Sequence, residues 1–166
     1  MKPTQNILMS LLSSLMLAAV CTTAVTVAEA ASGQYVEPKI NHQAYGSLKI
    51  VVPITTDDKA IQGMKLRNLE NSLESGKQWN AHIQSTVVLY ANGLSLLKSP
   101  DAETRKMIDA LKANSVKFVV CNNSLREQGI DFHQLYNVSE SAIVPSGFAE
   151  VAYLQAHQSY VVDPAN

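Results

Sequence analysis

Cys121 is the residue of this sequence whose type and position best suit chemistry. It ends an apolar run, VKFVVC at residues 116–121, and three polar residues that favour the start of a helix follow it: Asn122, Asn123 and Ser124. Free backbone N–H groups and the positive end of the helix dipole stabilise a thiolate, the nucleophilic form of cysteine. Arg126, one turn further on, would strengthen that field. In the alternative, Cys121 is a small buried hydrophobic residue without reactivity, and the sequence leaves both open.

The sequence lacks the patterns of metal, nucleotide and nucleic-acid sites. The four histidines, which show no close ligand spacing, are His42, His82, His133 and His157. Neither a GxGxxG motif after the first strand nor a GxxxxGKS or GxxxxGKT motif occurs. We therefore expect no metal and no cofactor. The formal net charge of −1 at pH 7 gives no reason to expect nucleic acid or an anionic membrane as a partner.

Helices are expected between apolar runs from residue 48 onward. The first is predicted from a cap at Asp57 or Asp58 to about Lys77. Its inner side would carry four apolar residues: Ile61, Leu66, Leu69 and Leu73. The second is predicted from a cap at Ser99, with Pro100 in the first turn, to about Asn114. Shorter helical stretches are expected to begin within residues 122–124 and to occupy residues 131–136 and 147–157.

The apolar runs themselves predict a parallel sheet. Five strands are expected, the last at an edge, at residues 48–54, 83–90, 116–121, 142–145 and 159–162. Strands that alternate with helices need crossover connections, so we predict an α/β domain with a flavodoxin-like fold and a mostly parallel sheet of about five strands, with helices on both faces. Ligands of such sheets bind outside the carboxyl ends of the strands. The candidate binding residues at that edge are Asn92, Gly93, Asn122, Asn123, Ser124, Arg126, Ser146 and Gly147.

The N-terminus has the three parts of a cleavable signal peptide. A basic start at Lys2 precedes an apolar stretch over residues 7–20, and Ala28-Glu29-Ala30 forms a small-residue cleavage site. We therefore predict a signal peptide at residues 1–30, an extended leader at 31–46 and one domain at 47–166. The expected location is periplasmic or secreted, without stable membrane insertion after cleavage. Because Cys21 leaves with the signal peptide, Cys121 is expected to be a free thiol without an internal disulfide.

Four segments, in this order and spacing, resemble the DsrE/DsrF-like family, especially its exported single-domain branch. They are KLRNLENSLESG at 65–76, LYANGLSLL at 89–97, VVCNNSLREQGI at 119–130 and VPSGFAEVAYLQ at 144–155, and the resemblance covers about residues 48–162. It implies a flavodoxin-like fold and frequent homo-oligomerisation. In cytoplasmic sulfur-relay members it implies a cysteine at the position of Cys121 that carries a persulfide. Those members tend to have Arg-Gly where this chain has Gln128-Gly129.

Two functions from different classes follow. In the first, an exported thiol protein of sulfur metabolism accepts a sulfane sulfur on Cys121, as a sulfurtransferase-like carrier at most. Its partners would be a sulfane-sulfur donor and an acceptor, with hydrogen bonds donated by residues 122–124 and with assistance from Arg126. In the second, the chain is a non-enzymatic small-ligand-binding or assembly module in which Cys121 is inert. Alkylation of the native protein separates the two, since only the first requires a thiol that reacts in the folded state.

Overall fold

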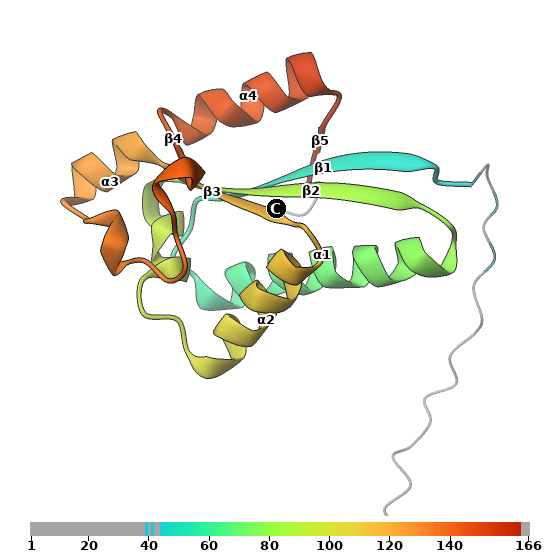
Figure 1. Ribbon diagram of the computed structural model, residues 1–166, viewed down its shortest axis with the longest axis horizontal. Coiled ribbons are helices and arrows are strands. Elements are labelled where there is room, and N and C mark those ends of the chain that lie inside the picture. Colours follow the sequence, from blue (N-terminus) through green and yellow to red (C-terminus); the bar gives the residue numbers. More distant parts are fainter. Residues whose placement is uncertain (1–38, 40, 42–43, 164–166) are drawn as a thin grey trace, which may run out of the picture. The chain divides into compact units, whose positions relative to one another are not determined.

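The fold is described from a computed structural model, which covers residues 39, 41 and 44–163. The signal peptide predicted at residues 1–30 and most of the predicted leader at 31–46 lie outside the described residues. From Ser47 onward strands and helices alternate (Figure 1). Within the described part of the chain, no helix is long and apolar enough to cross a membrane.

Five strands form one parallel sheet, as predicted. They are β1 (Ser47–Ile54), β2 (His82–Leu89), β3 (Lys117–Cys121), β4 (Ile143–Val144) and β5 (Val161–Val162), in the order β4-β3-β2-β1-β5. The two longest strands, β1 and β2, pair over eight residues each, from Ser47 opposite His82 to Ile54 opposite Leu89. The edge strands β4 and β5 have two residues each, so they are shorter than the apolar runs that predicted them.

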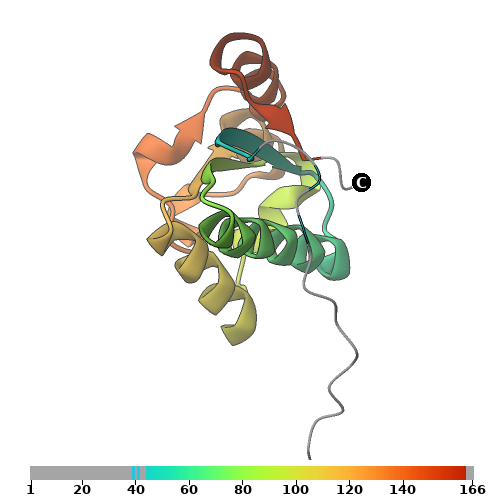
Figure 2. The same ribbon diagram turned by 90° about the vertical axis from the view of Figure 1, so that its right-hand side faces the viewer.

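Helices cover both faces of the sheet. They are α1 (Lys59–Gln78), α2 (Ala102–Ala113), α3 (Asn122–Gln128) and α4 (Gly147–Gln158), with 3-10 helices η1 (Ala91–Leu97), η2 (Phe132–Gln134) and η3 (Glu140–Ala142). Crossovers between parallel strands are right-handed, so the direction of each step decides which face its helix covers. The steps from β1 to β3 run one way and place α1 and α2 on one face. The step from β4 to β5 returns across the sheet and places α4 on the other (Figures 1 and 2).

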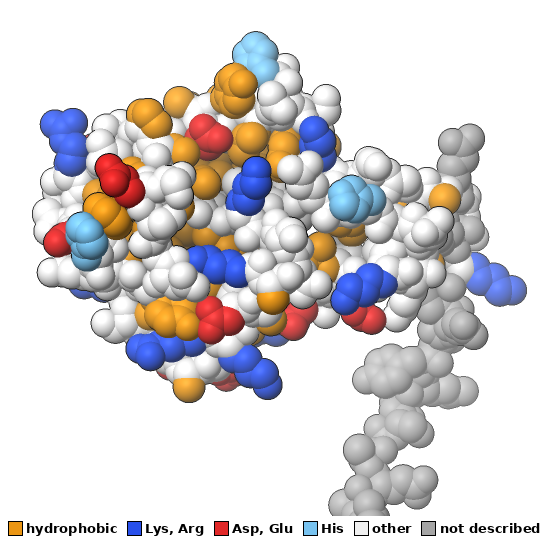
Figure 3. Space-filling view, in the orientation of Figure 1, with side chains coloured by type: hydrophobic (Ala, Val, Ile, Leu, Met, Phe, Trp, Pro, Cys, Tyr) orange, Lys and Arg blue, Asp and Glu red, His pale blue; other side chains and the backbone are white. Residues whose placement is uncertain are grey.

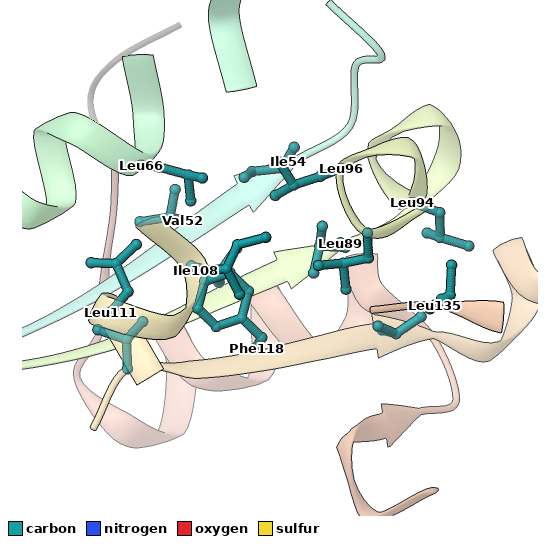
Figure 4. Packing of buried hydrophobic residues seen from close by; sticks show 14 of the residues in the cluster. Val52, Ile54, Leu66, Leu89, Leu94, Leu96, Ile108, Leu111, Phe118 and Leu135 are labelled. Carbon is teal, nitrogen blue, oxygen red and sulfur yellow. The ribbon is translucent and has the colours of Figure 1, made fainter. Parts of the chain in front are cut away.

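The core is divided by the sheet into a large and a small cluster. Because side chains alternate along a strand, Val52 and Ile54 of β1 point to α1 and α2, whereas Val51 points to α4. The large cluster combines Val52 and Ile54 with Leu66 of α1 and Ile108 of α2 (Figure 4). The small cluster contains four buried residues: Val51, Val88, Leu154 and Tyr160. The first predicted strand is thus buried on both faces, as its continuous apolar run indicated.

The helix caps agree with the sequence at one helix and differ at another. The carboxylate of Asp58 accepts hydrogen bonds from the N–H groups of Ala60 and Ile61, at 2.8 and 3.2 Å, and caps α1. The prediction of Ser99 as the cap of α2 is wrong. Asp101 is the cap, and its carboxylate accepts from the Thr104 N–H at 2.8 Å. Ser99 instead has a positive φ of 61° and belongs to the turn before the helix.

The inner side of α1 is more polar than predicted. Leu66 and Leu69 are buried, but Ile61 and Leu73 are only half-buried. Gln62 and Lys65 are buried in addition. The amide of Gln62 donates to the Thr56 carbonyl at 2.7 Å and to Ser95 Oγ at 2.8 Å, and Lys65 forms an ion pair with Asp163 at 2.9 Å. These partners, of which Ser95 and Asp163 are distant along the chain, satisfy the polar groups and allow their burial.

Candidate functional site at Cys121

The carboxyl end of β3 positions Cys121. It is the last residue of the strand and the N-cap of α3, which begins at Asn122 as predicted. Phe118 and Val120 belong to the large core cluster, whereas Val119 packs in the small cluster beneath α4. Because strand side chains alternate, Cys121 shares the face of Val119. The thiol therefore lies on the side of the sheet that α4 covers.

Polar groups from two helix starts lower the pKa of the Cys121 thiol. Burial by itself raises the pKa of the Cys121 thiol, but hydrogen bonds from the Ser124 hydroxyl, the Gly147 N–H and the N–H groups of Ser124 and Asn123 outweigh it. The net pKa lies below the ordinary value for cysteine. Donors aimed at sulfur favour the thiolate because the negative charge accepts stronger hydrogen bonds than the neutral thiol. Asn123 and Ser124 belong to α3, and Gly147 begins α4.

Cys121 is buried, so its thiol is shielded from solvent. Cys121 is a free cysteine with 4% of its surface exposed. The reason is that Gly147 and the start of α4 lie against it, a contact between segments that are far apart in the sequence. A reactant must therefore be small, or the first turn of α4 must move, before the sulfur can be attacked.

Ser124 connects the cysteine to the loop after β2. Its side chain is 4% exposed, and its Oγ accepts a hydrogen bond of 2.7 Å from the Ala91 N–H. A hydroxyl has one hydrogen to donate. With Ala91 as donor to the oxygen, the Ser124 hydrogen is available for the Cys121 sulfur. Ser124 is thus a predicted site residue that the structure does bring to the cysteine.

The predicted glycines are required by close packing. A Cβ on Gly147 would lie 2.8 Å from Cβ of Tyr90, and a Cβ on Gly93 would lie 1.8 Å from the carbonyl oxygen of Ile54. Ser146 caps α4, because its Oγ accepts from the Ala149 N–H at 3.3 Å. Gly93 thereby allows η1 to pack against the end of β1. Ser146 and Gly147 form the start of α4, which lies next to Cys121.

The remaining predicted binding residues are not among the groups that shift the pKa of Cys121. Asn92 is exposed on η1, and neither it nor Gly93 is among the groups that shift the pKa of Cys121. Arg126 was expected to strengthen the field at the thiolate, but it too is absent from those groups. It is exposed and, with Asn122, lines a hollow of about 700 Å³ between α3 and β4. Asp131, Glu140 and Phe132 line the same hollow.

Gln128 is a residue of the site that the sequence did not single out for a role. Its side-chain Nε2 donates a hydrogen bond of 2.7 Å to the carbonyl oxygen of Ala91. Ala91 has a positive φ of 47°, which is unusual for a residue with a Cβ. The α3 helix therefore holds both backbone groups of Ala91, since Ser124 accepts from its N–H. A glutamine at a helix end follows no recognisable pattern, so this contact is visible only in the folded chain.

Comparison with known proteins places this arrangement in a family. Residues 49–164 match the DsrE/DsrF-like family. Among solved structures, the chain is similar to a protein of unknown function, MTH1491, from Methanobacterium thermoautotrophicum, with 24% sequence identity and a TM-score of 0.58. The similarity covers 70% of this chain and 99% of that one, and it supports the fold. No curated protein matches the chain significantly.

Proposed function

The chain belongs to the DsrE/DsrF-like family, and from that premise we propose that it is a thiol protein of sulfur metabolism in which Cys121 accepts and carries a sulfane sulfur. The observation that carries the proposal is the position of Cys121 at the end of β3 and the start of α3, where Ser124, Gly147 and Asn123 lower its pKa. A buried cysteine with an inert packing role needs no such donors, and apolar surroundings would raise its pKa instead.

The proposed transfer is a thiol exchange on a persulfide donor. The Cys121 thiolate attacks the terminal sulfur of a donor R–S–SH, and a bond forms between the two sulfurs. The bond between the donor's inner and terminal sulfurs breaks, and its electron pair leaves with R–S⁻. The hydrogen stays on the transferred sulfur, so Cys121 becomes Cys–S–SH. An acceptor thiolate then attacks that terminal sulfur in the same way and regenerates the Cys121 thiolate.

The residues around Cys121 would favour both the acceptance and the release of the sulfur. Before the transfer, the donors from α3 and α4 increase the fraction of thiolate. After it, the same low pKa makes Cys121 a good leaving group, because thiols of low pKa leave faster. The small exposed fraction of Cys121, 4%, shields the persulfide from bulk oxidants. It also favours small inorganic polysulfides over bulky donors.

The test is the intact mass of the protein after exposure to a sulfane donor such as inorganic polysulfide. We expect the wild type to gain the mass of one sulfur atom and to lose it again on addition of a thiol. Cys121→Ser should fold and gain no sulfur, because serine occupies the same space and can cap α3. If the wild type gains no sulfur and its thiol resists alkylation until the protein is denatured, Cys121 is inert and the sulfur-carrier function is wrong.

We propose in addition that the protein is exported and that it forms a homo-oligomer through α4. Among the described residues, three large hydrophobic side chains are exposed: Phe148 at 73%, Tyr153 at 52% and Val161 at 58%. Phe148 and Tyr153 belong to α4 and Val161 to the neighbouring β5, and hydrophobic side chains reach the surface over α4 (Figure 3). Clustered exposed hydrophobic residues favour an interface. Phe148 adjoins Gly147, so such an interface would lie beside the thiol.

A further inference from the structure

We propose that Gln128, within the function proposed above, is a positioning residue: it fixes the Ala91 peptide, which in turn holds the Ser124 side chain in the first turn of α3, next to Cys121. Gln128 is the last residue of α3 and does not touch the sulfur itself. Its effect on Cys121 would pass through two hydrogen bonds that the folded chain makes. A role of Gln128 in sulfur transfer rests on the proposed function. The hydrogen bond between Gln128 and Ala91 does not depend on it.

The first link is between Gln128 and Ala91. The distance from Gln128 Nε2 to the Ala91 carbonyl oxygen is 2.7 Å. Ala91 is exposed at the start of η1, and its φ of 47° lies in the left-handed region. A residue with a Cβ leaves that region unless the surroundings hold it there. The amide of Gln128 is one of two groups on α3 that hold it.

The second link is between Ala91 and Ser124. The Ala91 N–H lies 2.7 Å from Ser124 Oγ, and Ser124 is in the first turn of α3. A serine in a helix can otherwise turn its hydroxyl to the carbonyl one turn earlier. The N–H of Ala91 occupies a lone pair of the oxygen and thereby holds the Ser124 side chain in one orientation, with its own hydrogen free to donate elsewhere. Displacement of the Ala91 peptide would release Ser124 from that orientation.

No charged side chain among the described residues accounts for the lowered pKa of Cys121. The titratable groups on the elements around Cys121 are Tyr90 after β2, Lys117 on β3, Arg126 and Glu127 on α3, and Glu150, Tyr153 and His157 on α4. None of these described side chains is among the groups that shift the pKa of Cys121. The hydrogen bonds are therefore the part of the site that a substitution at Gln128 can change.

The test compares Gln128→Met with wild type. Methionine preserves the length of the side chain and its neutral charge but cannot donate to the Ala91 carbonyl. We expect the pH midpoint of Cys121 alkylation to rise, with a roughly threefold lower thiolate fraction at neutral pH for each half unit of pKa. Gln78→Met, an equally exposed glutamine at the end of α1, is the matched control and should leave the midpoint unchanged. An unchanged midpoint in Gln128→Met overturns the inference.

A second variant tests the route through Ala91. Glycine adopts a positive φ without a steric penalty. We therefore expect Gln128→Met combined with Ala91→Gly to recover part of the wild-type midpoint, and a midpoint that stays fully shifted contradicts the route. The two proposals fail differently. If Gln128 has no effect, Cys121 still captures sulfur from polysulfide; if Cys121 captures none in the wild type, the alkylation midpoints still decide the role of Gln128.

Discussion

The backbone N–H of Gly147 is one of the groups that lower the pKa of Cys121. This effect links the first residue of α4 to the last residue of β3. It exists because Cys121 and Val144 are opposite each other in the β3–β4 pairing, so both strands end at the same edge and the chain turns into α4 there. The pKa of Cys121 thus depends on the packing of α4, and this dependence can be tested by substitution and by changes of pH.

Gly147→Ala should disturb both stability and the thiol. A Cβ at this position would lie 2.8 Å from Cβ of Tyr90, so the start of α4 must shift. We expect the free energy of unfolding in urea to fall by about 1–3 kcal/mol, the usual cost of overpacking. The pKa of Cys121 should rise, because the Gly147 N–H moves away.

Gly63→Ala is the matched control for that substitution. Its Cβ would meet only the flexible guanidinium of Arg67, at 3.2 Å, within α1. Alanine is the better helix former, so this variant should be neutral or more stable by about 0.4–1 kcal/mol. Equal losses in the two variants would contradict a specific role for the contact between Gly147 and Tyr90.

The lowered pKa of Cys121 predicts a pH-dependent contribution to stability. A thiol with a lower pKa in the folded than in the unfolded protein stabilises the fold above the unfolded value, about 8.5. The contribution is lost as the pH falls through the folded pKa. The stability difference between wild type and Cys121→Ser should therefore move in favour of the wild type as the pH rises from below the folded pKa to the unfolded value of about 8.5. Urea unfolding at several pH values measures it, and a difference that is constant or moves the other way contradicts the lowered pKa.

The ion pair between Lys65 and Asp163 should contribute strongly to stability. Both side chains are shielded, with exposed fractions of 10% and 11%, and the pair ties α1 to the residue after β5. Asp163→Asn removes the carboxylate of this shielded ion pair, and we expect a loss of about 3 kcal/mol in urea unfolding. In the exposed pair between Lys77 and Glu74, Glu74→Gln should cost less than about 0.5 kcal/mol. Similar losses at both pairs would show that burial is not the cause.

Self-association through α4 is testable in solution. We expect the wild type to be a homo-oligomer by light scattering at micromolar concentration. Phe148→Ser combined with Tyr153→Ser should dissociate it, because each loses an exposed apolar contact of the proposed interface. Lys106→Ser, an exposed substitution on α2 at the opposite face, should leave the mass unchanged. A monomeric wild type removes the proposal.

Export is testable at the N-terminus of the protein recovered from the producing cell. Signal peptidase cleavage after Ala30 predicts a chain that begins at Ala31 or within a residue or two of it. The protein should be released with the periplasmic or secreted fraction. An intact Met1 in a membrane fraction contradicts the prediction. Ala30→Pro, which disfavours cleavage at the predicted site, should retain the precursor.

The sequence by itself determined the elements and the chemistry of the candidate nucleophile. Continuous apolar runs predicted the five parallel strands because a strand covered on both faces has no polar side, as β1 shows. Asp58 and the start of α3 after Cys121 were predictable because capping depends on residues next to each other in the chain. Ser124, Ser146 and Gly147 were predicted as site residues because ligands of parallel sheets bind outside the carboxyl ends of the strands.

Only the tertiary structure decided how those pieces meet. The burial of Gln62 and Lys65 depends on partners elsewhere in the chain, so no local pattern could indicate it. The same holds for Ser99, which loses the cap of α2 to Asp101 because the turn after η1 gives it a positive φ. At the site, the Gly147 donor shields Cys121, and Gln128 holds Ala91 from another segment. Hydrogen bonds between distant segments form only after the strands have paired, because pairing is what brings their ends to one edge of the sheet.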